Sequence, residues 1–141
     1  MLHIICITRR HPGRLTPQAR STALRNLSKV LTWAGKTDEA NRLALQADQL
    51  GGGDGETAYL TGNALLEGGR VPEAIAKLNE ALQLDPNHAL AHNSLGTAYL
   101  KLGRPDDARR EFEKALQRRP QLAAAHNNLG ILYQNQKQFD Q

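Results

Sequence analysis

The chain is short of the residues that define several other protein classes. Its one cysteine, Cys6, allows no internal disulfide, and only 4% of its 141 residues are aromatic. No apolar run approaches the roughly 20 residues that a membrane-spanning helix requires. The single cysteine is compatible with a reducing compartment without demanding one. Together with the abundance of alanine and leucine, the shortage of aromatics favours thin helices packed in layers over one thick globular core.

Acidic residues are missing from one end of the chain. Residues 1–37 contain no Asp or Glu but seven Lys and Arg residues, whereas the remaining 104 contain eleven basic and fourteen acidic residues. The net charge of +4 therefore resides at the N-terminal end. We interpret residues 1–20 as a basic arm that we expect to be poorly ordered. This composition also bears a faint resemblance to a mitochondrial presequence.

What the chain does contain is a repeated pattern, clearest between Ala89 and Leu122. The following residues fall at the spacings of a 34-residue helix-turn-helix repeat: Leu95, Gly96, Tyr99, Ala108, Phe112, Ala115 and Pro120. Gly103 is predicted to end the first helix, and Pro105 to open the second. The sequence is therefore similar to the tetratricopeptide repeat (TPR) family. This resemblance implies an all-α fold, an α-solenoid of stacked antiparallel helix pairs wound into a right-handed superhelix.

The pattern recurs without insertions and predicts units at 21–54, 55–88 and 89–122, with a partial fourth unit at 123–141. The small-residue column contains Ser28, Gly62, Gly96 and Gly130, and the inter-helix turn column contains Gly35, Gly69, Gly103 and Lys137. In the fourth unit we expect a helix over 124–136, a turn at Lys137 and the start of a second helix. We expect the chain to be a fragment of a longer array. The alternative is that this uncovered C-terminal helix docks on another chain, self-association included.

Some residues depart from the pattern. Ala44 is smaller than Leu78 and Phe112, which occupy the same column in the next two units. Thr61 brings a hydroxyl into an apolar column, and we expect it to bond a carbonyl one turn earlier in its own helix. The glycines at 51–53 lack the Lys-Ser/Thr of a phosphate-binding loop, so we interpret them as a flexible joint.

No arrangement of residues predicts catalysis, a cofactor site or a metal site. His92 and His126 resemble a pair but lie 34 residues apart in one column of successive units. No Cys, Asp or Glu accompanies either at ligand spacing on its own helix. We therefore expect half-buried structural histidines, and a chain that is not an enzyme and takes no cofactor or small-molecule substrate.

The TPR resemblance implies a concave groove, lined by the first helix of each pair, in which extended peptides of partner proteins bind. The groove positions carried over from the family are Arg25, Asn26, Lys29, Tyr59, Asn63, Asn93, Ser94, Thr97, Lys101, Asn127, Asn128 and Asn135, together with Trp33, Leu60, Glu67 and Ile131. Asparagine recurs in this set. Because its side chain both donates and accepts, it suits a ligand held by its backbone rather than by its side chains.

Two TPR sub-families fit poorly. Domains that hold the acidic tails of heat-shock chaperones need lysines, asparagines and an arginine in columns that here contain Arg25, Lys29, Leu60, Leu90 and Ser94. The TPR arm of O-linked N-acetylglucosamine transferases carries an asparagine ladder in a column that here reads Asn26, Leu60, Ser94 and Asn128. The first comparison disfavours the chaperone-tail function, and the second leaves only a weak analogy.

The sequence thus favours a non-enzymatic protein–protein interaction module that binds an extended peptide or partner helix in the groove. One alternative is a TPR adaptor that belongs to a longer enzyme, such as a glycosyltransferase. Nucleic-acid binding through the basic arm is less favoured, because no aromatic residue precedes Trp33 to stack on bases. We expect a cytoplasmic location, with a mitochondrial one as the alternative suggested by the acid-free N-terminus.

Overall fold

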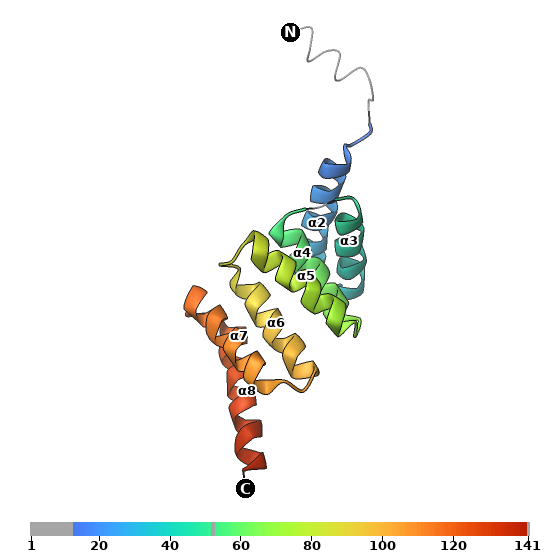
Figure 1. Cartoon of the computed structure of the whole chain (residues 1–141). Helices are drawn as coiled ribbons and strands as arrows, with labels where there is room; N and C mark the ends of the chain where they lie inside the picture. Colours follow the sequence, from blue (N-terminus) through green and yellow to red (C-terminus); the bar gives the residue numbers. More distant parts are fainter. Residues whose placement is uncertain (1–12, 52, 141) are drawn as a thin grey trace.

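The computed structural model describes residues 13–51 and 53–140, and this part of the chain is built of helices without strands (Figure 1). The helices are α2 (Pro17–Trp33), α3 (Thr37–Gln49), α4 (Gly55–Glu67), α5 (Val71–Leu84), α6 (Ala89–Lys101), α7 (Pro105–Arg118) and α8 (Ala123–Phe139). The predicted all-α solenoid class is confirmed.

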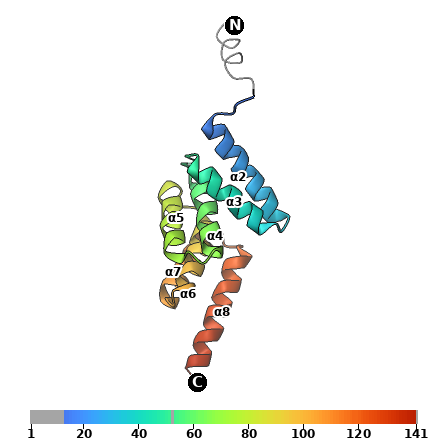
Figure 2. The ribbon, with the colours of Figure 1, turned by 90° about the vertical axis from the view of Figure 1, so that its right-hand side faces the viewer.

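The helices form antiparallel pairs that stack in chain order. The pairs are α2–α3, α4–α5 and α6–α7, and the second helix of each pair packs on the first helix of the next. First helices also touch one another, α4 with α6 and α6 with α8. In both views α2 and α8 lie at opposite ends of the stack (Figures 1 and 2). Lys29 of α2 also forms an ion pair with Glu56 of α4, so the first helices α2, α4 and α6 share one side of the molecule.

Local signals in the sequence set where the helices begin and end. The hydroxyl of Thr16 accepts from the Ala19 amide at the start of α2, and the Asp54 carboxylate accepts from the Thr57 amide at the start of α4. After α2, α4 and α6 the chain turns through glycines with φ of +76°, +78° and +70°, at Gly35, Gly69 and Gly103. Glycine adopts this left-handed conformation without the strain that a Cβ would bring.

Two boundaries differ from the prediction. Helix α2 begins at Pro17, so the last four residues of the expected arm, 17–20, are helical, while residues 1–12 lie outside the described part. The predicted turn at Lys137 is wrong, because α8 continues through it to Phe139. Lysine cannot take the left-handed turn as readily as glycine, and Lys and Gln are good helix formers. The limits of the repeat units themselves stay a prediction.

The core lies in thin layers between successive helices. Leu78 of α5 packs with Ala58 of α4 and Leu95 of α6, so it joins the second pair to the third. Phe112 of α7 likewise packs with Ala108 and with Leu132 of α8. Each layer couples two consecutive pairs, which is the nearest-neighbour architecture of repeat proteins.

The first pair is held differently, by hydroxyl groups. Ser21 Oγ donates to the Ala47 carbonyl at 2.7 Å, and Ser28 Oγ donates to the Ala40 carbonyl at 2.7 Å. Thr61 Oγ1 donates at 3.4 Å to the carbonyl of Ala44 in α3. The expectation that Thr61 bonds its own helix is therefore wrong, because an acceptor in the preceding pair lies within reach.

Candidate functional site

Two adjoining hollows cross the side of the stack that the first helices share. The first, of about 300 Å³, lies between α2, the start of α3 and α4, with Leu90 of α6 at its edge. The second, also about 300 Å³, lies between α4 and α6. Asn63 and Glu67 line both hollows. We call the combined surface the groove.

The groove combines apolar and polar lining. Tyr59, Leu60 and Leu90 supply apolar surface in the first hollow, and the Trp33 side chain, 86% exposed, lies at its margin. Polar side chains lie beside them, among them Asn63, which is half-buried in α4. Ligand sites commonly combine apolar walls with a few polar groups that fix orientation.

The cations near the first hollow are already paired. Arg25 of α2 forms an ion pair with Asp54, and Lys29 Nζ lies 2.7 Å from Glu56 Oε1. Burial raises the pKa of Asp54, but bonds from Thr57 and Arg25 outweigh it, so this pKa lies below its usual value. Because these carboxylates already neutralise the two cations, the first hollow has little positive charge left for an acidic ligand.

His88 joins α4 and α6 at one end of the groove. Its Nδ1 accepts from the Ala91 amide at 3.1 Å, so the proton resides on Nε2, which donates to Glu56 Oε2 at 3.1 Å. This bond, followed by Lys29, lowers the pKa of Glu56 to about 2 against the opposing effect of burial. The His88 ring also lies against Tyr59, with centroids 4.6 Å apart. Helices α2, α4 and α6 are thereby held in one arrangement.

The structure brings half of the predicted groove residues together. Those that line the hollows are Lys29, Tyr59, Asn63, Ser94, Thr97 and Lys101, with Trp33, Leu60 and Glu67 from the same columns. The other predicted residues lie outside the lining: Arg25, Asn26, Asn93, Asn127, Asn128 and Asn135.

The residues outside the lining have identifiable surroundings. Arg25 is tied to Asp54, and Asn128 Nδ2 donates to Asn93 Oδ1 at 3.0 Å, so those two asparagines bond each other across α8 and α6. Asn26, Asn127 and Asn135 are exposed. Ile131, carried over with them, is also exposed. Their part in binding stays a prediction.

Some groove residues were missed because they lie outside the columns carried over from the family. Thr37 and Asn41 belong to α3, a second helix, yet both line the first hollow. Asn41 Nδ2 donates to Glu67 Oε2 at 2.6 Å and so joins α3 to α4. Nothing in the local sequence signals a contact over 26 residues. Glu56 is likewise a lining residue, and its acidic position in the first turn of α4 was the one available signal.

His92 is buried in the joint between α6 and α7 rather than in the groove. Its Nδ1 lies 2.8 Å from Glu111 Oε2, and its Nε2 lies 3.3 Å from the Pro86 carbonyl. Burial raises the pKa of Glu111, but bonds from His92 and Lys114 outweigh it and leave this pKa below its usual value. The sequence showed no acid on the histidine's own helix, and the acid comes instead from α7. Among the described residues no three potential metal ligands gather.

None of the described helices is both long and apolar enough to cross a membrane.

Comparison with known families agrees with this architecture. A TPR repeat model matches residues 62–103, and a tetratricopeptide repeat model matches residues 89–122. The matched segments cover helices α5 to α7 and the C-terminal part of α4. Residues 62–122 of the chain are therefore tetratricopeptide repeats by sequence as well as by fold.

Solved structures share the fold at low sequence identity. The Arabidopsis OM64 TPR domain is 21% identical, with a TM-score of 0.73 over 84% of this chain and 98% of that one. The first TPR of Spaghetti (RPAP3), bound to the HSP90 peptide SRMEEVD, is 19% identical, with a TM-score of 0.71 over 85% and 95%. A Thermobaculum terrenum O-GlcNAc transferase is 24% identical, with a TM-score of 0.74 over 84% of this chain but 23% of that one. No curated protein matches the chain.

Proposed function

We propose that this chain is a non-enzymatic protein–protein interaction module that holds an extended segment of another protein along α2, α4 and α6. The observation that carries the proposal is the continuity of the groove, whose two hollows meet at Asn63 and Glu67. A structural neighbour bound to a peptide adds support at the level of the fold.

The lining suggests how a peptide would be held. Asn63 lies where the hollows meet, and its amide can donate to one backbone carbonyl and accept from one backbone amide of the ligand. Tyr59, Leu60 and Leu90 offer an apolar surface for one ligand side chain. Burial raises the pKa of the Tyr59 phenol, so the phenol stays neutral around pH 7.

The charges favour a neutral or basic ligand over an acidic one. Lys29 is already paired with Glu56, and Glu67 adds a carboxylate to both hollows. The family's clamp for acidic tails would need polar groups where Leu60 and Leu90 lie. We therefore propose a ligand with an apolar side chain and no acidic cluster, unlike the peptide SRMEEVD bound by the structural neighbour.

A peptide-selection experiment tests this proposal. Ten-residue peptides are selected from a random library on the full chain, and fluorescence anisotropy gives their affinities for the wild type, Asn63→Ala and Asn79→Ala. Asn79 is an exposed asparagine of α5, outside the groove, and serves as the matched control. We expect Asn63→Ala to weaken binding roughly tenfold, the equivalent of one good hydrogen bond, and Asn79→Ala to leave it unchanged. Equal binding by all three proteins, or enrichment of acidic tails, would contradict the proposal.

A double variant tests how far the ligand extends. Asn93→Ala combined with Asn127→Ala removes two predicted groove asparagines that lie outside the described hollows. If the ligand extends past the two hollows, to Asn93 on α6 or Asn127 on α8, this variant binds more weakly than the wild type. Unchanged binding would restrict the site to the lining of the two hollows.

Two other functions remain as alternatives. The glycosyltransferase neighbour favours a TPR adaptor in a longer enzyme, and the genomic frame around this sequence tests it, since an adaptor requires an in-frame catalytic domain.

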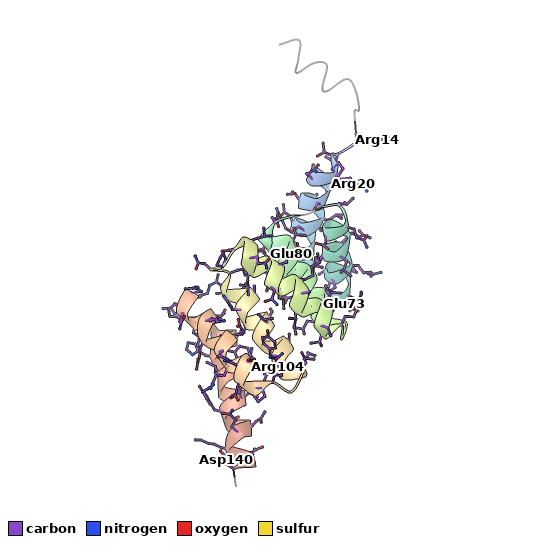
Figure 3. All side chains as sticks on the ribbon, viewed as in Figure 1. Arg14, Arg20, Glu73, Glu80, Arg104 and Asp140 are labelled. Carbon is purple, nitrogen blue, oxygen red and sulfur yellow. The ribbon has the colours of Figure 1, made fainter. Side chains whose placement is uncertain are left out.

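Nucleic-acid binding ranks last. Arg14 and Arg20 lie at the α2 end of the stack, away from Glu73 and Glu80 on α5 (Figure 3). A gel shift with generic RNA that weakens as salt is added would support nucleic-acid binding at this end. The cytoplasm stays the expected compartment, with a mitochondrial one as the alternative.

A further inference from the structure

The last residue of each of the helices α2, α4 and α6 lines the groove. These residues are Trp33, Glu67 and Lys101. Each follows the previous one by one repeat length, so the three share a column of the repeat. Trp33 and Glu67 line the first hollow, and Glu67 and Lys101 line the second. An aromatic ring, a carboxylate and an ammonium group therefore follow one another along the groove.

Glu67 and Lys101 differ from the other charges of the groove because they are not neutralised. Lys29 and Glu56 form an ion pair with each other. Neither Glu67 nor Lys101 takes part in an ion pair with a described residue, although both are exposed in the same hollow. Glu67 accepts at Oε2 from Asn41 Nδ2 at 2.6 Å, which leaves Oε1 without a described donor. Both charges are thus available to a ligand.

The position of Glu67 brings no benefit to its own helix. The C-terminal end of a helix carries partial negative charge, so a basic residue stabilises it and an acidic residue opposes it. Lys101 follows this preference at the end of α6, whereas Glu67 opposes it at the end of α4. Exceptions to local preferences are expected at functional sites. The carboxylate of Glu67 is therefore better explained by ligand binding than by helix stability.

We propose that Glu67 and Lys101 select the ligand by charge, so that Glu67 binds a basic side chain and Lys101 an acidic side chain of one extended segment. This inference rests on the proposed function, since it names the ligand chemistry of the same groove. A cation beside Glu67 can also stack on the ring of Trp33, which is 86% exposed in the same hollow. Arginine suits both contacts, because its planar guanidinium bonds carboxylates and stacks on aromatic rings.

The distance between first helices sets the spacing of the two ligand charges. Helices α4 and α6 contact each other, and the axes of packed helices lie about 8–10 Å apart. A polyproline II segment rises about 3.1 Å per residue with three residues per turn, so residues i and i+3 lie on one face about 9 Å apart. The ligand therefore carries its arginine and its Asp or Glu three residues apart.

The chain's own N-terminal segment does not carry this pair of charges. Residues 1–37 contain arginines, among them Arg9 and Arg10, but no Asp or Glu, so the segment offers no carboxylate to Lys101. The occupant is therefore a segment of another protein. A synthetic peptide of residues 1–12 checks this choice as a competitor, and displacement of a selected peptide from the groove would contradict it.

Charge exchange between protein and peptide tests the proposal. The probes are the tightest ten-residue peptide selected on the full chain and a version in which its arginine and acidic residue exchange places. Relative to the wild type, we expect Glu67→Lys combined with Lys101→Glu to bind the selected peptide roughly tenfold more weakly and the exchanged peptide roughly tenfold more tightly, as measured by fluorescence anisotropy. Circular dichroism should show a folded variant, since both side chains are exposed.

The outcomes separate this inference from the proposed function. Selected peptides that bind without an arginine and an acidic residue three apart, or an exchanged peptide that gains nothing on the double variant, would overturn the charge assignment and leave the groove intact. Selection of no peptide at all would contradict the inference and the proposed function together.

Glu113→Lys is the matched control for net charge. Glu113 is exposed on α7, outside the lining of the groove, and its replacement changes the net charge of the chain by the same amount as Glu67→Lys. We expect Glu113→Lys to change the affinity for the selected peptide less than twofold, and Glu67→Lys to weaken it roughly fivefold. Equal losses would contradict a local contact at Glu67.

Trp33→Ala tests the contact between the aromatic ring and the arginine. The wild type is expected to bind the selected peptide roughly threefold more tightly than a version with lysine in place of the arginine, because the guanidinium stacks on the ring. Trp33→Ala should remove this preference. A preference that survives in Trp33→Ala would contradict the Trp33 contact.

Discussion

The first helix pair, α2–α3, and the third, α6–α7, follow the same path but are held together by different contacts. In the third pair the Phe112 ring fills the space beside Gly96. In the first pair the corresponding positions are Ser28 and Ala44, and Ser28 Oγ donates to the Ala40 carbonyl instead. The third pair thus combines the smallest residue, Gly96, with the large Phe112, whereas the first pair combines Ser28 with the small Ala44. The total side-chain volume between the helices is redistributed between the two positions.

Because the two pairs are held by different contacts, we expect different substitutions and conditions to destabilise them. Burying a phenylalanine contributes about 1.5–3 kcal/mol, whereas a neutral hydrogen bond contributes about 0.5–1.5 kcal/mol net. The first pair also depends on ion pairs to its neighbours, from Arg25 to Asp54, Lys29 to Glu56 and Lys77 to Asp48. We therefore expect the third pair to be sensitive to side-chain volume, and the first pair to polar substitutions and acid.

The largest effect is expected from removing the aromatic ring of the third pair. Phe112→Ala leaves a cavity beside Gly96 and takes contacts away from Ala108 and Leu132, so the free energy of unfolding should fall by about 3–5 kcal/mol. Urea unfolding followed by circular dichroism measures the change. A loss below about 1 kcal/mol would show that the third pair does not depend on this packing.

The next effect compares two glycines of one column. Gly96→Ala forces a Cβ into the Phe112 ring and should cost about 1–3 kcal/mol. Gly130→Ala adds the same methyl group where no described atom lies within 4 Å, so it should stabilise α8 by up to about 1 kcal/mol through helix propensity. Thermal unfolding of both variants checks the opposite signs. The same sign for both would refute the contrast between the tightly packed Gly96 of α6 and the open Gly130 of α8.

A smaller effect is expected in acid, from the ion pairs that attach the first pair. The Glu56 pKa is about 2 in the folded chain and 4.5 ordinarily. The ionised Glu56 therefore adds to the free energy of unfolding above pH 4.5, and this addition is lost as the pH falls from 4.5 through 2. After allowance for the partial exposure of Glu56, we expect the free energy of unfolding to fall by about 1–2 kcal/mol over this range. Urea unfolding at several pH values should show that the free energy of unfolding falls less steeply with pH in Glu56→Gln than in the wild type. An equal fall in both proteins would count against the bond from His88.

The smallest effect is expected from the hydroxyl contact of the first pair. Ser28→Ala removes the bond to Ala40 and should cost about 0.5–1 kcal/mol. Thr32→Ala on the same helix removes a hydroxyl that bonds only within α2, to the Ser28 carbonyl at 2.9 Å. It is the matched control, with an expected change within about 0.5 kcal/mol. If both variants behave alike in urea, the first pair is not held by its hydroxyl bonds.

Much of the fold could be predicted because the repeat signals are local. Gly103 and Pro105 mark the turn between α6 and α7 through backbone preferences that act within a few residues. The errors arose at positions where the repeat column predicted one structure and the residue type favoured another. Lys137 occupies a turn column but continues the helix, and Thr16 with Pro17 is a capping signal that the arm interpretation overrode.

The candidate groove was less predictable because its contacts cross between pairs. Lys29, Asn63 and Thr97 could be predicted because they occupy one column of the 34-residue repeat, which the TPR resemblance assigns to the concave face. The bond from Asn41 to Glu67 depends on how α3 approaches α4, which no local pattern encodes. The ion pair of Arg25 with Asp54 likewise depends on how the start of α4 approaches α2, which no local pattern encodes.

The central claim is that the first helices of successive pairs form one peptide-holding surface. The most direct measurement is amide chemical-shift mapping of the full chain with a library-selected peptide. The account predicts that the largest changes lie at Lys29, Asn63 and Thr97 on α2, α4 and α6. Changes confined to α3, α5 and α7 would contradict it.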